Sequence, residues 1–276
     1  MPKGGHGGRR NVNESNKSNP APSNAPSVQH SASSWTSPNT TIHNPPSSFT
    51  PQMLSDFGHT HRPTGIDILE VGYFWTHFFR RNNVEMTFVS PRGGPVALDP
   101  ISIETMEKDD KLAKELKEDN EFMLKLGHTY PINWISPEDY DFVLIPGGHG
   151  AMFDLPEHDD VANVIAKIYE NGGFTCAIGH GVSALLNVKL RNTSEYLLKN
   201  KRVACYSNAE EKEKRFDEYL PYYLEDRAKE RGAKVETNKP FQPKVVVEDR
   251  LITAQSWPSI HEFVQKVVDS VASGRR

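Results

Sequence analysis

Two short apolar runs, each followed at once by a glycine-rich turn, constrain the fold of this chain more than any other feature. The runs are "YDFVLI" (140–145), which leads into "PGGHG", and "FTCAI" (174–178), which leads into "GHG". Continuous apolar runs of this length are typical of parallel strands that are buried on both faces. The sequence therefore predicts a sheet in which these two strands lie in the interior, with their glycine turns at one edge.

Helical patterns alternate with the predicted strands. A helix is predicted around 161–168, another over 209–220, which Pro221 interrupts, and a last one over 260–271. Further strands are predicted at 84–89 and 202–207, and two strands around an acidic turn at 243–255. This alternation indicates an α/β domain with a mostly parallel sheet and helices on both faces. Sites in such sheets form beyond the carboxyl ends of the strands, so the loops 146–150, 179–181 and 207–211 should lie together.

The beginning of the chain differs in composition from the rest. Residues 1–50 contain 24 Ser, Asn or Pro and nine apolar residues. Such a stretch cannot bury enough apolar surface to offset its conformational entropy. We therefore expect a disordered tail over residues 1–63 and a domain over residues 64–276.

Charge and composition argue against several classes of protein. A net charge of −4 with interspersed acids and bases does not indicate a nucleic-acid groove. No apolar stretch approaches the roughly 20 residues of a membrane helix. Two cysteines suit a reducing compartment, and we expect a cytoplasmic protein. The scarcity of acids in the first 50 residues is a feature of transit peptides, but an amphipathic Arg-rich helix is missing there.

The turn at 179–181 has the setting of a nucleophile elbow, in which a tight strand-to-helix turn exposes one reactive side chain. The tip of this turn is Gly179, which has no side chain to activate. The neighbouring His180 is a candidate base or orienting group, and Glu70 is an acid inside an apolar stretch that is able to move protons if it is buried. The alternatives are a plain turn, a hydrogen-bonded structural histidine and a solvent-facing acid.

Other candidates lie on the neighbouring loops. Gly147 and Gly148 bring bare backbone N–H groups close to where an anionic oxygen would bind, or they only form a tight turn. Glu210 and Glu211 follow a predicted strand and begin a helix that Asn208 would cap, which is a sufficient structural role. Cys176 and Cys205 are expected to be buried, inert thiols.

Taken in order, six segments resemble the ThiJ/PfpI (DJ-one) superfamily. They are "TGIDILE", "FVSPRGGPVALDP", "EDYDFVLIPGGHGAMFDLP", "AIGHGVSALL", "YSNAEE" and "LITAQSWPS". The nearest branch is the glyoxalase III and heat-shock chaperone group, and the resemblance extends from Thr64 to Ser270. It implies a flavodoxin-like three-layer sandwich, which is also described as class I glutamine amidotransferase-like.

The resemblance also implies an active site. Glu70, His180 and Glu211 would be its early glutamate, elbow histidine and distal acid, and Gly147 and Gly148 its oxyanion loop. The family's nucleophilic cysteine falls on Gly179. In the family's reaction, methylglyoxal adds to the thiolate and is released as D-lactate, with no glutathione, metal or other cofactor.

Three functions remain open from the sequence. The first is an enzyme acting on methylglyoxal or a similar small carbonyl compound, which the resemblance favours and Gly179 opposes. The second is a chaperone-like holdase or binding scaffold. The third is a hydrolase or lyase in which Glu70 or His180 activates water. The expected partners are small carbonyl compounds rather than nucleic acid or membrane, and a homodimer is one assembly to consider.

A second departure from the family concerns its first strand, which lies centrally in the sheet. Upstream of Thr64 the nearest segment, "TTIHNPPSSFTPQML", has three prolines and no apolar run. The strand is therefore expected to be degenerate or missing, and a missing central strand would leave two strand edges unpaired.

Overall fold

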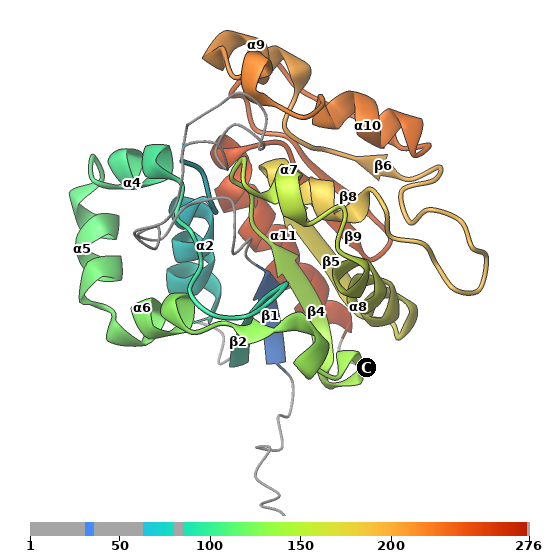
Figure 1. Cartoon of the computed structure of the whole chain (residues 1–276), viewed down its shortest axis with the longest axis horizontal. Coiled ribbons are helices and arrows are strands. Elements are labelled where there is room, and N and C mark those ends of the chain that lie inside the picture. Colours follow the sequence, from blue (N-terminus) through green and yellow to red (C-terminus); the bar gives the residue numbers. More distant parts are fainter. Residues whose placement is uncertain (1–30, 36–62, 80–84, 275–276) are drawn as a thin grey trace, which may run out of the picture.

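A seven-stranded sheet organises the computed structural model, which describes residues 31–35, 63–79 and 85–274 (Figure 1). Its strands are β1 (Ser31–Trp35), β2 (Glu85–Ser90), β3 (Tyr130–Pro131), β4 (Tyr140–Ile145), β5 (Phe174–Ile178), β8 (Val245–Glu248) and β9 (Leu251–Ala254). Their order across the sheet is β3-β2-β1-β4-β5-β9-β8. All neighbours are parallel except β8 and β9, which are antiparallel. The predicted α/β fold with a mostly parallel sheet is confirmed.

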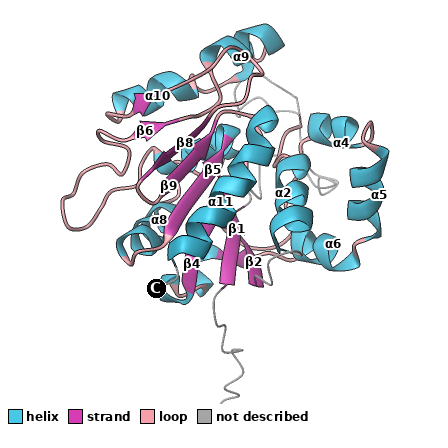
Figure 2. Ribbon diagram, turned by 180° about the vertical axis from the view of Figure 1, so that it is seen from behind, coloured by secondary structure: helices cyan, strands magenta, loops and turns pink. Residues whose placement is uncertain are grey.

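Helices cover both faces of the sheet (Figures 1 and 2). One face packs against α2 (Ile68–Phe74), the π-helix η1 (Trp75–Phe79), α4 (Pro100–Met106), α5 (Asp110–Glu118), α6 (Asn120–Gly127) and α11 (Ile260–Gly274). The other face packs against α7 (Ala151–Asp154), α8 (Asp159–Glu170), the 3₁₀-helix η4 (Gly179–Leu185) and α10 (Leu224–Glu230). The result is the flavodoxin-like three-layer sandwich that the resemblance implied.

The remaining elements are short. They are the 3₁₀-helices η2 (Ile132–Trp134), η3 (Pro137–Asp139), η5 (Asp217–Tyr219) and η6 (Trp257–Ser259), the helix α9 (Asn208–Lys214), and the strands β6 (Arg202–Val203) and β7 (Lys234–Val235). The strands β6 and β7 form a separate two-stranded parallel sheet.

The two cores lie on opposite faces of the sheet, and strand alternation divides the side chains between them. In β4, Phe142 and Leu144 belong to the core under α2 and α11, whereas Val143 and Ile145 belong to the core under α8. Successive side chains of a strand point to opposite faces, so a strand buried on both sides must be apolar throughout. This requirement explains the uninterrupted apolar runs in the sequence.

The central strand of the sheet comes from a segment that we assigned to the tail. The strand β1 pairs in parallel with β2 on one side and with β4 on the other, with Ser33 opposite Thr87 and Val143. The family's first strand is therefore present upstream of Thr64, as the five residues Ser31–Trp35. The alternative that this strand is missing was wrong. The other residues of the predicted tail lie outside the described ranges, apart from Pro63.

Two local predictions are corrected by the structure. The strand predicted over 202–207 extends only over β6, and it pairs with β7 outside the main sheet. The helix predicted over 209–220 ends at Lys214, because Arg215 adopts the left-handed conformation with φ of 57°. No helix within the described ranges has the length and hydropathy needed to span a lipid bilayer.

Candidate active site

The three loops that the sequence placed together do lie together at the carboxyl ends of β4 and β5. His149, on the loop after β4, and His180, directly after β5, both contact Glu211 in the first turn of α9. Gly147 contacts Glu70 from α2. The structure therefore brings Glu70, His180 and Glu211 to one end of the sheet.

Gly179 occupies a sharp turn between β5 and η4. Its φ is +57°, in the left-handed region that side chains other than glycine rarely adopt. A Cβ atom placed there would lie 3.4 Å from Oε1 of Glu70 and 3.9 Å from the carbonyl oxygen of Gln255. These are ordinary contact distances, so a Cβ atom fits beside Glu70, while the left-handed φ of the turn would strain any residue other than glycine.

Glu70 is buried and is the third residue of α2, in the first turn of the helix. The Asp67 carboxylate caps this helix by accepting hydrogen bonds from the N–H groups of Leu69 and Glu70. The Glu70 side chain is 3% exposed, and its Oε2 accepts a hydrogen bond of 2.6 Å from the N–H of Gly147. Burial, and secondarily the nearby charge of Asp67, raise the pKa of Glu70 well above its usual value, although the Gly147 hydrogen bond opposes this. Burial also raises the pKa of Asp67, to about 6.

Replacing Glu70 by Gln should stabilise the protein increasingly as the pH rises. An acid whose pKa is raised by folding keeps its proton in the native state after the unfolded chain has lost it, so the free energy of unfolding falls as the pH rises above the ordinary value of 4.5. The slope for one group is at most about 1.4 kcal/mol per pH unit. Glu70→Gln removes this loss.

Denaturant unfolding of the wild type and Glu70→Gln between pH 4 and pH 8 measures the effect. The difference in free energy of unfolding, variant minus wild type, should grow with pH. The exposed Glu104 provides the matched control, and for Glu104→Gln the difference should stay flat. A difference for Glu70→Gln that is flat or shrinks with pH would show that Glu70 is ionised in the native state.

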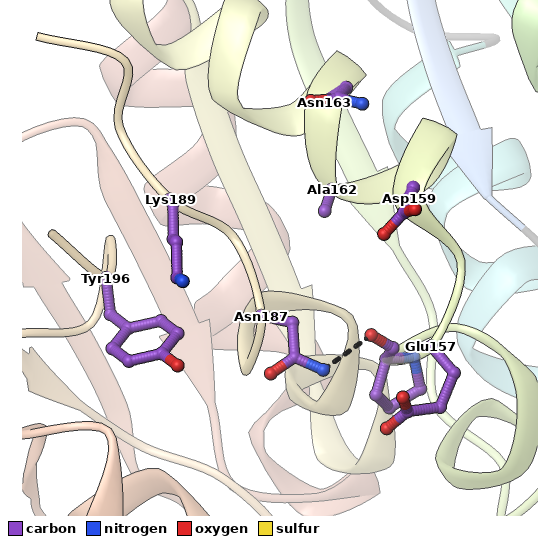
Figure 3. A pocket seen from close by; sticks show the side chains of 8 residues that line it. Glu157, Asp159, Ala162, Asn163, Asn187, Lys189 and Tyr196 are labelled. Atoms are coloured by element: carbon purple, nitrogen blue, oxygen red, sulfur yellow. Dashed lines mark hydrogen bonds between the residues drawn. The ribbon is translucent and has the colours of Figure 1, made fainter. Parts of the chain in front are cut away.

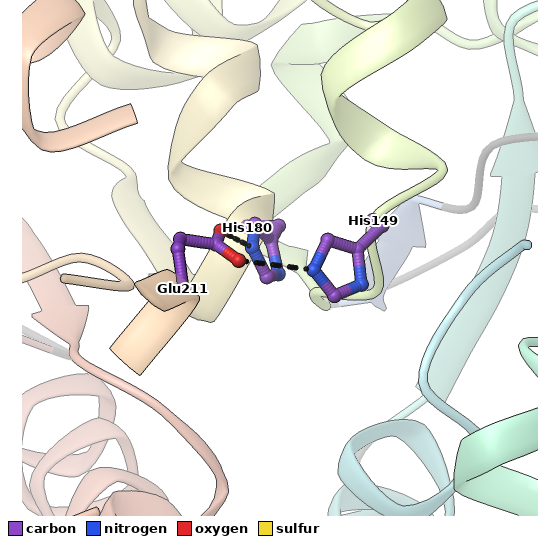
Figure 4. A group of neighbouring side chains, drawn as sticks. All are labelled: His149, His180 and Glu211. Carbon is purple, nitrogen blue, oxygen red and sulfur yellow. Dashed lines mark hydrogen bonds and ion pairs between the residues drawn. The ribbon is translucent and has the colours of Figure 1, made fainter. Parts of the chain in front are cut away.

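Two histidines converge on the Glu211 carboxylate (Figure 4). Nε2 of His180 lies 2.6 Å from Oε1 and Nε2 of His149 lies 3.3 Å from Oε2. Glu211 and His180 are almost completely buried, and the side chain of His149 is 18% exposed. Burial would raise the pKa of Glu211, but the two imidazoles outweigh it and lower this pKa to about 2. Burial lowers the pKa of His149, and His180 adds to this effect.

Aromatic rings hold the two imidazoles. The ring of Tyr206 stacks on His180 with centroids 4.2 Å apart, and the ring of Phe216 meets His149 edge to face at 4.7 Å. The imidazole centroids themselves are 4.1 Å apart. Packed neighbours on both sides restrict the rotamers of His149 and His180, so the group is arranged before any ligand binds.

The start of α9 separates the roles of its two acids. The cap is Ser207 rather than the expected Asn208: its hydroxyl accepts from the N–H of Glu210, and the Glu210 carboxylate accepts from the N–H of Ser207. Oε1 of Glu210 also accepts hydrogen bonds from Phe241 and Ser256. Glu210 therefore serves the helix end, and the following residue, Glu211, points to the histidines.

The glycine loop after β4 is built around close backbone contacts. A Cβ on Gly148 would lie 2.2 Å from the carbonyl oxygen of Gly65, and the φ of Gly148 is +99°. A Cβ on Gly147 would lie 2.9 Å from Oε2 of Glu70. The N–H of Gly147 donates to that same oxygen, so it has a protein acceptor in place of the substrate oxygen that we expected. An oxyanion role for Gly147 requires Glu70 to release this N–H.

Both cysteines are buried in the interior. Cys176 lies in β5 and Cys205 just before α9, and each is 0% exposed. Burial raises the pKa of both thiols well above the ordinary value. Neither supplies a thiolate at neutral pH, which agrees with the expectation of inert thiols.

The sequence reasoning missed His149 and Tyr206. His149 stands inside the "PGGHG" motif, where only the glycines were considered. A histidine in a loop beyond a buried strand was the available signal, because such loops meet at the site edge. No sequence pattern pointed to Tyr206, since its stacking on His180 depends on where the chain turns after β6.

The structure also has a hollow with a different lining (Figure 3). Its volume is about 340 Å³, and it is lined by Pro156, Glu157, Asp159, Ala162, Asn163, Asn187, Lys189 and Tyr196. Asn187 crosses it by donating a hydrogen bond to the carbonyl oxygen of Pro156. None of the candidate active-site residues lines this hollow.

Known proteins resemble this chain over most of its length. A family model described as the DJ-1/PfpI family matches residues 64–270. The glutathione-independent glyoxalase HSP31 of Saccharomyces cerevisiae is 25% identical over 214 residues, which cover 75% of this chain and 90% of that protein. The glutathione-independent glyoxalase hsp3102 of Schizosaccharomyces pombe is 31% identical over 136 residues, and the match covers 48% of this chain and 56% of that protein.

Solved structures agree with this relationship. The Rapid Encystment Protein 24 KDa of Francisella tularensis is 26% identical, with a TM-score of 0.77 over 88% of this chain and 99% of that one. Glyoxalase III of Candida albicans shares the fold, with a TM-score of 0.70 at 20% identity over 88% of this chain and 98% of that one. Because the family model matches well over half of the sequence, this chain belongs to the DJ-1/PfpI family.

Proposed function

We propose that this protein is a glyoxalase III-like carbonyl-stress protein that retains the site for a small carbonyl compound and has lost the thiol-dependent reaction. Its relatives are named glutathione-independent glyoxalases. The observation that carries the proposal is the turn at Gly179, where the elbow backbone and the neighbouring Glu70 and His180 are in place without a nucleophilic side chain.

The reaction implied by the family depends on a sulfur atom at this turn. The thiolate adds to the aldehyde carbon of methylglyoxal to form a hemithioacetal, and the buried acid moves protons to give a lactoyl thioester. Water then cleaves the C–S bond of this thioester, which releases D-lactate and returns the thiol. Removing the nucleophile from a cooperative site typically costs about 10⁶ in turnover. Cys176 and Cys205 are held in the interior with raised pKa values, so they do not replace it.

The remaining groups suit binding without conversion. The Glu70 carboxyl group lies 3.4 Å from the position of a Cβ atom at Gly179. The neighbouring residue, His180, forms a buried polar pair with Glu211. A hydroxyl or carbonyl oxygen of a three-carbon compound finds both donors and acceptors among these side chains. The physiological role that follows is sequestration or sensing of such compounds.

Binding of D-lactate, the unreactive product of the family's reaction, tests the proposal. Amide chemical shifts of the ¹⁵N-labelled protein should change at Glu70, Gly147, Gly179 and His180, and less with L-lactate. Gly147→Ala should abolish these changes, because the new methyl group would push against the Glu70 carboxylate. Gly127→Ala is the matched control, since nothing lies within 4 Å of its Cβ position. Wild-type spectra that respond to neither enantiomer would contradict the proposal.

A holdase role is a second candidate, and one surface observation favours it. Leu124, Tyr130 and Trp134 are 62%, 55% and 73% exposed, and Met123 is 43% exposed. Contiguous exposed apolar patches are typical of surfaces that bind other proteins, and these four residues fall within residues 123–134 of the chain. On this candidate, the wild type suppresses light scattering of a heat-denatured client protein, and Leu124→Ser with Trp134→Ser weakens the suppression. A wild type that leaves scattering unchanged contradicts it.

A further inference from the structure

The Glu211 carboxylate has two imidazole partners, although the family resemblance assigns a role in the reaction to only one of them, His180. The resemblance assigns His180 and Glu211 to the site as its elbow histidine and distal acid, and it does not include His149. In the structure His149 nevertheless turns its Nε2 toward the second carboxylate oxygen, so both oxygens of Glu211 face ring nitrogens (Figure 4). Ligand atoms of His149, His180 and Glu211 all lie within 4.8 Å of one another.

We propose that His149, His180 and Glu211 bind a divalent transition-metal ion, with Zn²⁺ as the first candidate. Imidazole nitrogen and carboxylate oxygen are ligands that Zn²⁺ accepts, at about 2.0–2.2 Å. Two ligands at that distance in tetrahedral geometry lie about 3.3–3.5 Å apart. The separation of 3.3 Å between His149 and Glu211 lies in this range. The separation of 2.6 Å between His180 and Glu211 is shorter, so this ring and the carboxylate must move apart to admit the ion.

The surroundings favour a preformed site. Tyr206 and Phe216 pack on the two imidazoles and limit their rotation. Glu211 is fixed by the capped first turn of α9, where Ser207 and Glu210 form a reciprocal pair of hydrogen bonds.

Two histidines and one glutamate form the ligand set of a metal site that keeps an open position. In zinc enzymes with three protein ligands, the fourth position holds water or substrate. Such a position suits water or the oxygen of a small carbonyl compound. This inference concerns metal binding alone, so it stands or fails independently of carbonyl binding.

Titration of the chelator-treated, full-length protein with ZnCl₂ against a chromophoric chelator tests the site, and CoCl₂ gives its visible absorption spectrum. The wild type should bind one ion at this site and show the absorption of a low-coordinate Co²⁺. His149→Gln should weaken that binding by about 100-fold or more, the upper range for groups that only support a ligand. His128→Gln is the matched control, because His128 is exposed on another segment.

A second readout keeps the test independent of folding defects in the variant. Zn²⁺ should raise the Tm of the wild type and of His128→Gln, since a ligand that binds only the native state stabilises it. It should leave the Tm of a folded His149→Gln unchanged. Equal Zn²⁺ affinity of His149→Gln and the wild type, or a wild type that binds no ion, would overturn the proposal.

Discussion

Replacing Gly179 by Cys should give the protein methylglyoxal-dependent D-lactate formation that the wild type lacks. The backbone there already has φ of +57°, the elbow conformation, and the new Cβ would lie 3.4 Å from Oε1 of Glu70. The thiol would also stand directly before His180 in the chain. Since a nucleophile contributes about 10⁶ in turnover to a cooperative site, the gain should be large enough to measure even if the restored site is imperfect.

The experiment compares the wild type, Gly179→Cys, Gly179→Ala and Gly179→Cys with Glu70→Gln. Gly179→Ala is the matched control, because it imposes the same backbone strain, about 1–3 kcal/mol, without a thiol. D-lactate should appear only with Gly179→Cys, and Glu70→Gln should suppress it. The introduced thiol should also react with a disulfide reagent faster than Cys176 and Cys205, which are buried. A folded Gly179→Cys with an unreactive thiol would show that the site itself has decayed, which favours the holdase.

Removing β1 should abolish cooperative folding. The strand lies between β2 and β4, so a chain without it leaves two strand edges in the middle of the sheet unpaired. Buried backbone groups without partners each cost about 1–3 kcal/mol, and several of them exceed the roughly 5–15 kcal/mol of a typical domain. A chain starting at Pro63 should therefore lack a cooperative thermal transition.

The control for this deletion is a chain starting at Val28, which keeps Ser31–Trp35. It should unfold cooperatively, near the Tm of the full chain. Ser33→Pro in the full chain tests the same point without a deletion, because proline removes a backbone N–H from the middle of a central strand. A chain starting at Pro63 that unfolds with the wild-type Tm would show that the domain is complete without β1.

The sheet could be predicted wherever side chains determine the strand. The runs in β4 and β5 are apolar because both faces are buried, and the strands predicted at 84–89 and 243–255 correspond to β2, β8 and β9. The strand β1 could not be predicted, because "SASSW" has no apolar run and its place is defined by backbone pairing with two neighbours. Arg202–Val203 was placed correctly as a strand, but its partner β7 lies outside the main sheet.

The sequence predicted which residues belong to the candidate site better than it predicted the contacts between them. Family resemblance selected Glu70, His180 and Glu211, and the structure places all three at the carboxyl end of the sheet. The choice of Glu211 over Glu210 depends on which carboxylate the helix cap uses, and this requires the geometry of Ser207. The approach of His149 to the same carboxylate depends on the path of the glycine loop, which is set by the close contacts of Gly148.

The most direct test of the central claim is D-lactate release from methylglyoxal by the wild type, without glutathione and after treatment with a chelator. Our account predicts no D-lactate above the rate in buffer, because no thiolate is available at Gly179 and both cysteines are buried. Chelator treatment separates this claim from metal binding at His149, His180 and Glu211. Robust release of D-lactate that persists in Cys176→Ala with Cys205→Ala would contradict the account, and it would assign the reaction to water activated by Glu70 or His180.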